Sequence, residues 1–230
     1  MTATTLGYAF LGGLLPSIIW LYFLLQEDAR HPEPKKMIAY AFIAGMVAVP
    51  LAIPLEQYAK ATLIGTMPVL AAWALIEEVL KYVMAAVFIL WRPVVDEAPD
   101  YVIYMLTVAL GFAAAENMLF LLGPIINGGI ASSIFTGDIR FIGSTLLHVF
   151  ASAAIGFALA FSDFSRPIVR MAAGAGGVIL AVTLHTAFNA LIITQGTSTT
   201  LAAVFLVWIA AVIFFAAFEV LKYFQSRNLA

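Results

Sequence analysis

Seven apolar stretches, separated by short polar or turn-forming segments, make up most of this sequence. Each is about as long as the roughly 20 apolar residues that a helix needs to cross the hydrocarbon core of a bilayer. The pattern therefore predicts an all-α protein, a polytopic transmembrane helical bundle of about seven spans. The predicted spans are residues 6–25, 37–57, 66–91, 101–122, 140–161, 170–194 and 200–222.

The segments between these stretches carry residues that are typical of turns and helix ends. They are "QEDARHPEPKK" (26–36), "RPVVDEAPD" (92–100), "GPIINGG" (123–129), "SDFSRP" (162–167) and "QGTSTT" (195–200). None is long enough to form a soluble domain, and we find no internal repeat. We therefore expect residues 1–230 to form a single integral-membrane domain. The first basic residue, Arg30, follows the first apolar stretch, which favours a retained helix over a cleaved signal peptide.

Composition supports the membrane assignment and excludes several kinds of chemistry. Hydrophobic residues make up 63% of the 230 residues and charged residues only 10%, against about 25% charged residues in an average soluble domain. The net charge of −2 and the lack of a basic stripe argue against nucleic acid as a partner. The absence of cysteine excludes disulfides, thiolate metal ligands and a cysteine nucleophile.

The basic residues are distributed unevenly between alternate loops of the predicted bundle. One side has only Lys60 and Arg140, and the remaining basic residue, Lys81, lies within a span. The other side has eight: Arg30, Lys35, Lys36, Arg92, Arg166, Arg170, Lys222 and Arg227. Cytoplasmic loops are enriched in lysine and arginine, so this bias predicts an N-terminus outside the membrane and a C-terminus in the cytoplasm.

The third apolar stretch contains three charged residues, Glu77, Glu78 and Lys81, in "LIEEVLKYVMAAVFILW" (75–91). A charged residue near the middle of a lipid-facing helix costs at least about 2.5 kcal/mol, and such residues indicate a functional site by default. The i,i+4 spacing predicts an ion pair between Glu77 and Lys81, which leaves Glu78 without a cation on its own helix. Glu56 and Glu219 are near predicted helix ends, where we expect them to be interfacial.

Further polar residues occur on the next three predicted helices, at a similar depth. With 1.5 Å per residue, Glu78 lies about 18 Å from the outer end of its helix, Glu116 about 9 Å, His148 about 12 Å and His185 about 14 Å. Because successive helices alternate in direction, all four residues are expected to form one layer nearer the same face. Asn189 follows His185 by one helical turn and shares its face.

Carboxylates and imidazoles without cysteine are typical of chemistry on an activated water molecule. In one version Glu77 or Glu78 acts as the general base, with Lys81 fixing the orientation of the carboxylate. In the other, a divalent metal, most readily zinc, lowers the pKa of a bound water; its ligands would be Glu78, Glu116, His148 and His185. In either version His185 and Asn189 are placed to stabilise an oxyanion. The H-E-x-x-H zinc motif and a G-x-S-x-G serine motif are both absent.

Four short motifs in order resemble a known family. "EEVLK" (77–81) matches E-E-x-x-K, "FAAAEN" (112–117) matches F-x-x-x-E, and His148 and "HTAFN" (185–189) follow on later spans. Together they resemble the PrsW family of intramembrane proteases over about residues 10–195. Its relatives include CAAX-prenyl proteases, bacteriocin-processing proteins and the scaffold subunit of γ-secretase. CAAX-type relatives carry E-E-x-x-x-R and F-x-x-x-H, so Lys81 and Glu116 place this chain nearer PrsW.

The resemblance implies a function and a set of site residues. It implies a bacterial cytoplasmic-membrane protease that cuts a single-pass substrate, typically an anti-sigma factor, near the extracytoplasmic face. Glu77 and Glu78 would be catalytic, and the later polar residues would complete the site: Glu116, His148, His185 and Asn189. Two alternatives remain open. A proton-coupled transporter also carries Glu, His and Lys at mid-membrane, and a non-catalytic scaffold would use the polar layer only for assembly.

Overall fold

A computed structural model of the protein describes residues 3–27, 31–193 and 197–228, with the backbone alone described for residues 127–142 and a few others. Within these ranges the chain forms seven α-helices and one π-helical turn. They are α1 (Ala3–Glu27), α2 (Lys35–Thr62), α3 (Thr66–Ala85), the π-helical turn η1 (Ala86–Leu90), α4 (Ala98–Ile142), α5 (Ser144–Phe161), α6 (Pro167–Ile193) and α7 (Thr197–Asn228). The prediction of an all-α bundle of seven helices is confirmed.

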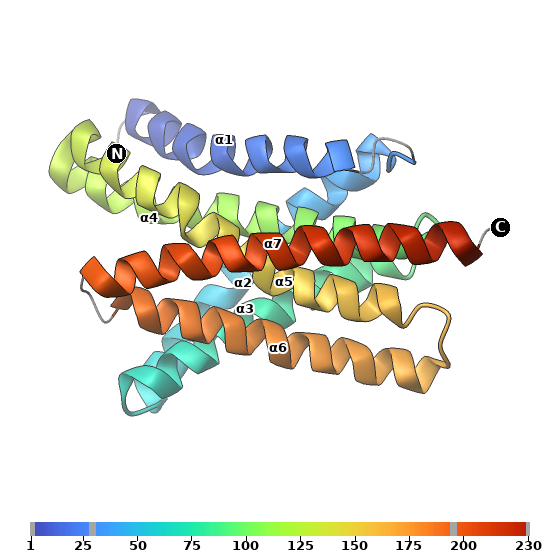
Figure 1. The fold of residues 1–230 in the computed structure, drawn as a ribbon. Coiled ribbons are helices and arrows are strands. Elements are labelled where there is room, and N and C mark those ends of the chain that lie inside the picture. The colour runs from blue at the N-terminus through green and yellow to red at the C-terminus, as the bar shows by residue number, and fades with distance from the viewer. Residues whose placement is uncertain (1–2, 28–30, 194–196, 229–230) are drawn as a thin grey trace.

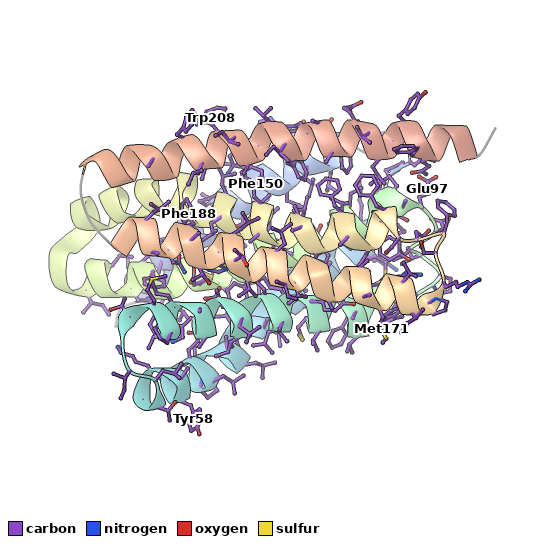
Figure 2. The ribbon with its side chains drawn as sticks, turned by 60° about the horizontal axis from the view of Figure 1, so that its bottom comes forward. Tyr58, Glu97, Phe150, Met171, Phe188 and Trp208 are labelled. Atoms are coloured by element: carbon purple, nitrogen blue, oxygen red, sulfur yellow. The ribbon has the colours of Figure 1, made fainter. Side chains whose placement is uncertain are left out.

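Six of the helices in the described part of the chain are long and apolar enough to cross a membrane. The exception is α3, which contains Glu77, Glu78 and Lys81. Large hydrophobic side chains are exposed on the outside of the bundle, as expected for a surface that faces lipid. Tyr58 is 70% exposed and Trp208 is 67% exposed, and both point outward, whereas Phe150 and Phe188 point into the bundle (Figure 2).

The prediction of a break at residues 123–129 is wrong. Helix α4 continues through Gly123, Pro124 and the following glycines to Ile142, and the helix boundary comes at Gly143. A proline inside a helix removes one backbone hydrogen bond and glycine weakens a helix by about 1 kcal/mol, so neither has to end it. The part of α4 that fits a membrane span ends at Gly123.

The predicted orientation of the bundle across the membrane stays a prediction. Arg30 lies outside the described residues, and so do the side chains of Arg140 and Arg227. These three residues were among the lysines and arginines counted on the two sides of the membrane to predict the orientation.

The first half of α4 forms the centre of the bundle. Every residue from Ala98 to Ala114 is buried, which is the pattern of a helix enclosed on all sides. Helices α1, α2 and α5 all pack on α4. In Figure 1, α1 lies along the top of the bundle, α7 crosses the front, and α2 and α3 form an antiparallel pair that leans away at the lower left.

Glycines allow α2 and α4 to approach to backbone contact. A Cβ added at Gly45 would lie 1.9 Å from the carbonyl oxygen of Val108, and one added at Gly111 would lie 1.9 Å from that of Phe42. Small residues at such crossings are typical of membrane helices, where close packing replaces the hydrophobic effect as the source of association. These two glycines therefore set the distance between α2 and the central helix.

We predict that Gly45→Ala destabilises the bundle. The methyl group would meet the Val108 backbone, and overpacking of this kind costs about 1–3 kcal/mol. Gly176→Ala on α6 is the matched control, because nothing lies within 4 Å of its added Cβ and alanine is a better helix former than glycine by about 1 kcal/mol. Thermal unfolding in detergent should show a lower Tm for Gly45→Ala alone. Equal Tm values for the two variants would contradict the close crossing.

Candidate active site

Four helices bring the predicted polar residues together inside the bundle. Glu78, Lys81, His148 and His185 are each no more than 1% exposed, and Glu77 is 5% exposed. The ring centroids of the two histidines are 5.2 Å apart. These residues come from α3, α5 and α6, and Glu116 of α4 contacts His148, so the polar groups lie close together; their depth in the membrane and their roles stay predictions.

The Glu78 carboxylate receives hydrogen bonds from three donors on three helices. Lys81 Nζ on α3 donates to Oε1 over 2.6 Å, His185 Nδ1 on α6 lies 2.8 Å from the same oxygen, and Ser152 Oγ on α5 donates to Oε2 over 2.8 Å. Charge-assisted hydrogen bonds of this length are among the strong ones. Both oxygens of Glu78 are thus occupied by groups of the protein itself.

The predicted ion pair between Glu77 and Lys81 is wrong. Lys81 pairs with Glu78 at i,i+3, and its ammonium group also lies 3.0 Å from His148 Nδ1 on α5 and 4.6 Å from the centre of the Phe112 ring on α4. Spacing within one helix allows either pairing. Glu78 is the partner of Lys81 because residues of α5 and α6 also bind this pair, and the spacing within one helix cannot show these contacts.

His185 connects the two carboxylates of α3. Because Nδ1 donates to Glu78, its other nitrogen, Nε2, carries the free lone pair, and it lies 3.8 Å from Glu77 Oε2. A histidine whose one nitrogen is fixed by a carboxylate while the other points at a shared centre is the usual arrangement of a metal-binding histidine. Glu78 therefore orients His185.

His148 lies between Lys81 and Glu116. The ammonium of Lys81 has only donors, so His148 Nδ1 accepts from it, and Nε2 then carries the proton and donates to Glu116 Oε2 over 3.2 Å. Ser144 also donates to Glu116 Oε2, over 3.2 Å. Nδ1 is the nitrogen that faces Glu77, at 3.8 Å from Oε2. A cation bound at Nδ1 would take over the lone pair that Lys81 now uses.

Glu77 Oε2 is buried and has no hydrogen-bond partner among the described residues. A buried carboxylate oxygen without a partner is costly. Its two distances of 3.8 Å to imidazole nitrogens are too long for hydrogen bonds. They are close to the separation of about 3.3–3.6 Å between two ligands that a tetrahedral ion holds at 2.0–2.2 Å. Glu77, His148 and His185 offer ligand atoms that all lie within 4.8 Å of one another, so these residues fit a divalent cation.

This group differs from the ligand set that the sequence predicted. Glu78 is engaged with Lys81, His185 and Ser152 and does not belong to it. Glu116 contacts Nε2 of His148, on the opposite side of the ring from Glu77. Among the described residues, the ligand atoms that lie close together are those of Glu77 and the two histidines; metal binding stays a prediction.

The structure also shows which residues the sequence analysis missed or misplaced. Ser152 donates to Glu78, and its position one turn after His148 on the same face of α5 could have indicated it. Asn189 is half-buried one turn after His185, but among the described residues it makes no hydrogen bond to the cluster. Next to Glu116, Asn117 donates to Thr145 Oγ1 over 3.1 Å, which joins α4 to the start of α5.

These observations define a helical membrane protein with a buried cluster of glutamate and histidine that fits a metal ion. The sequence model of one family, described as PrsW family intramembrane metalloprotease, matches residues 33–218. The match covers most of the chain, so the protein belongs to the PrsW family.

Two curated relatives have the same name. The chain is 28% identical over 125 residues to "Protease PrsW" of Geobacillus kaustophilus (strain HTA426), which covers 53% of this chain and 56% of that protein. It is 25% identical over 162 residues to "Protease PrsW" of Bacillus subtilis (strain 168), which covers 69% of this chain and 71% of that protein. The first alignment thus spans little more than half the length of that relative. No solved structure matches the chain.

We predict that Lys81→Met destabilises the protein strongly, because it leaves the Glu78 charge buried without its cation. Breaking a buried ion pair in this way costs about 3–5 kcal/mol, whereas removing both charges is often nearly neutral. The double variant Glu78→Gln/Lys81→Met should therefore unfold in detergent at a higher temperature than Lys81→Met alone.

The matched control is the pair Glu219 and Lys222 on α7. It has the same i,i+3 spacing, but the Glu219 side chain is 69% exposed. Exposed pairs contribute about 0–1 kcal/mol, so Lys222→Met should have little effect on Tm. A Lys81→Met variant as stable as Lys222→Met would contradict the ion pair as a source of stability.

Proposed function

We propose that this protein is an intramembrane protease that hydrolyses a peptide bond of a single-pass membrane protein. The observation that carries the proposal is the Glu77 oxygen that is buried, lacks a partner and faces two imidazole nitrogens. Membership of the PrsW family and two relatives named as proteases support the same activity.

We infer that Glu77, His148 and His185 hold a divalent metal ion, with zinc the best match to one carboxylate and two imidazoles. A bound metal ion of this kind polarises a carbonyl group and lowers the pKa of a coordinated water to about 7. The other residues of the cluster act on these ligands. Glu78 fixes the ring of His185, while Lys81 and Ser152 fix Glu78.

Glu116 is the most exposed of the three glutamates that contact the two histidines. Its side chain is 20% exposed, compared with 7% for Glu77 and 0% for Glu78. Glu78 already accepts three hydrogen bonds, whereas Glu116 lies beside His148 at the edge of the cluster. Glu116 accepts from Nε2 of His148, on the side of the ring away from Glu77, so we assign to it the orientation of the His148 ring, as Glu78 orients His185. To Asn189, one turn after His185, we assign the stabilisation of the oxyanion that forms on the substrate carbonyl.

A metal-free version of the mechanism uses the same residues differently. Here Glu77 Oε2 takes one proton of the attacking water, and the lone pair of His185 Nε2 accepts a hydrogen bond from the other hydrogen, while His148 Nδ1 keeps its hydrogen bond from Lys81. In both versions the substrate is a single-pass protein of the anti-sigma-factor type, cut near the extracytoplasmic face. The site of action is the bacterial cytoplasmic membrane.

The proposal predicts that Glu77→Gln abolishes proteolysis while the protein still folds. Purified protein and a single-pass anti-sigma factor would be reconstituted in liposomes, and the products identified by mass spectrometry. A loss of at least about 100-fold in cleavage rate is expected, because Glu77 is a ligand of the metal in one version and the base in the other, and a lost base alone typically costs about 10²–10⁴-fold. Glu219→Gln, on an exposed side chain of α7, should cleave like the wild type.

Adding a chelator distinguishes the two mechanisms. Cleavage that stops when chelator is added and returns with Zn²⁺ supports the metal version. Cleavage that is unaffected by chelator but is lost in Glu77→Gln supports the metal-free version. Full activity of Glu77→Gln, or no cleavage by the wild type, would contradict the proposed function.

A further inference from the structure

A group of basic and aromatic side chains lies where η1 ends and α6 begins. The guanidinium of Arg170, in the first turn of α6, lies over two aromatic rings, with Cζ 4.7 Å from the centre of the Tyr101 ring and 5.5 Å from that of Trp91. Two more arginines adjoin this stack. The Arg170 amide donates to the Arg166 carbonyl over 3.1 Å, and Arg92 directly follows Trp91. The three arginines and the two rings together form the arginine patch.

Arg170 is held in place by contacts that leave one of its donors unused. Nη2 donates to the Tyr101 hydroxyl, and Nη1 pairs with Asp163 Oδ1 over 3.4 Å. Tyr101 in turn donates to the same Asp163 oxygen over 3.0 Å. The Nε atom of Arg170 is buried and has no hydrogen-bond partner among the described residues. A buried donor that the protein leaves unsatisfied is commonly explained by a bound ion or water.

Arg92 and Arg166 carry charges that no described residue neutralises. Both side chains are exposed, and within the described part of the chain neither forms an ion pair or a side-chain hydrogen bond. Arginine stays protonated in proteins, so these charges do not depend on a titration. Asp163 contacts Arg170 alone. The patch therefore has an excess of positive charge at its surface.

The acidic residues at this end of the bundle have other contacts. Glu97 pairs with His31 over 2.9 Å, Glu33 accepts a hydrogen bond from Tyr104, and Asp96 interacts electrostatically with Tyr104. Where the structure describes these side chains, none of them pairs with an arginine of the patch. The end of the bundle thus has an acidic group around Tyr104 and His31 and a basic group around Tyr101.

The arginine patch lies at the level of the membrane where lipid headgroups begin. The apolar spans of three helices start or end around it, at Ala98 of α4, Phe161 of α5 and Pro167 of α6. Trp91 is 65% exposed, and tryptophan is enriched at this level in membrane proteins. Figure 2 shows Met171, which follows Arg170, at this end of the bundle. The anions that the patch meets in a membrane are therefore the phosphate groups of lipids.

We propose that the arginine patch binds the phosphate group of an anionic phospholipid. Basic pockets between membrane helices are a known means of binding such headgroups. Arg92 and Arg166 each present a fork of donors that matches a phosphate, and Arg170 adds its charge and the unused Nε. The site lies about 22 Å along α6 from His185, so it is separate from the candidate active site and does not depend on the proposed function.

The lipid's acyl chains distinguish it from a free phosphate ion. Large apolar side chains beside the arginines are exposed, with Phe164 at 76% and Ile168 at 66%. Acyl chains attached to the phosphate can cover these side chains, whereas inorganic phosphate cannot. The net charge distinguishes an anionic lipid from phosphatidylcholine, whose choline group cancels the charge of its phosphate.

Lipid retention by the full-length protein tests the proposal. Native mass spectrometry counts the lipids that stay bound after transfer from micelles that contain phosphatidylglycerol and phosphatidylcholine in equal amounts and with the same chains. The wild type should retain phosphatidylglycerol at least about tenfold more than phosphatidylcholine, the order expected for two arginines near an anionic headgroup. Arg92→Gln/Arg166→Gln should lose most of this preference and still fold, because both side chains are exposed.

The matched control is Lys35→Gln/Lys36→Gln. It removes the same charge at the same end of the bundle, from two exposed residues at the start of α2. This variant should keep the preference for phosphatidylglycerol. An equal loss in the two double variants would assign the preference to overall charge and would overturn the site, as would a wild type that retains both lipids equally.

Thermal unfolding in detergent separates the lipid from the free ion. Phosphatidylglycerol should raise the Tm of the wild type and of Lys35→Gln/Lys36→Gln, and it should raise that of Arg92→Gln/Arg166→Gln less. Inorganic phosphate at the same concentration should leave all three values unchanged. An equal rise of the wild-type Tm with inorganic phosphate would overturn the lipid as the occupant of the patch.

Discussion

The hydrogen bonds to Glu78 hold the site together. A buried carboxylate must be stabilised within a bundle whose outer surface faces lipid, and Glu78 achieves this with donors from α3, α5 and α6. The same contacts tie these three helices to one another and fix the ring of His185. Once Glu78 has taken Lys81 and His185 Nδ1, its neighbour Glu77 is left with a buried oxygen that no described residue satisfies. The two adjacent glutamates therefore differ: both oxygens of Glu78 accept hydrogen bonds, whereas Glu77 Oε2 accepts none from the described residues.

The central helix α4 connects this cluster to the lipid-facing surface. Its first half is buried on every side, and glycine contacts hold α2 against it at backbone distance. Beyond this region, Phe112 packs against Lys81 and His148, and Glu116 contacts His148. Ala115 and Leu119 line an apolar groove of about 250 Å³ between α1, α2 and α4.

The sequence predicted the helices well and indicated which polar residues lie close together, because both depend on local and strongly biased patterns. Apolar runs of about 20 residues have few alternatives to membrane helices, and charged residues within them are rare enough to indicate function. The pairing of these residues could not be predicted in the same way. Lys81 can reach either glutamate on its own helix, and the choice of Glu78 depends on Ser152 and His185 from other helices. The continuation of α4 past Gly123 was not predicted either, because local turn rules treat a glycine followed by a proline as a helix end.

The central claim is that Glu77, His148 and His185 form one cation site, and metal titration tests it most directly. Zn²⁺ would be titrated calorimetrically into chelator-treated protein in detergent, with Glu77→Gln as the test variant and Glu219→Gln as the control. The account predicts one ion per chain in the wild type and in the control, and binding weakened at least about tenfold in Glu77→Gln, since altering even the residues that only orient a metal's ligands typically lowers metal affinity 10–100-fold. Zn²⁺ binding of equal strength in all three proteins, or no binding to the wild type, would contradict it.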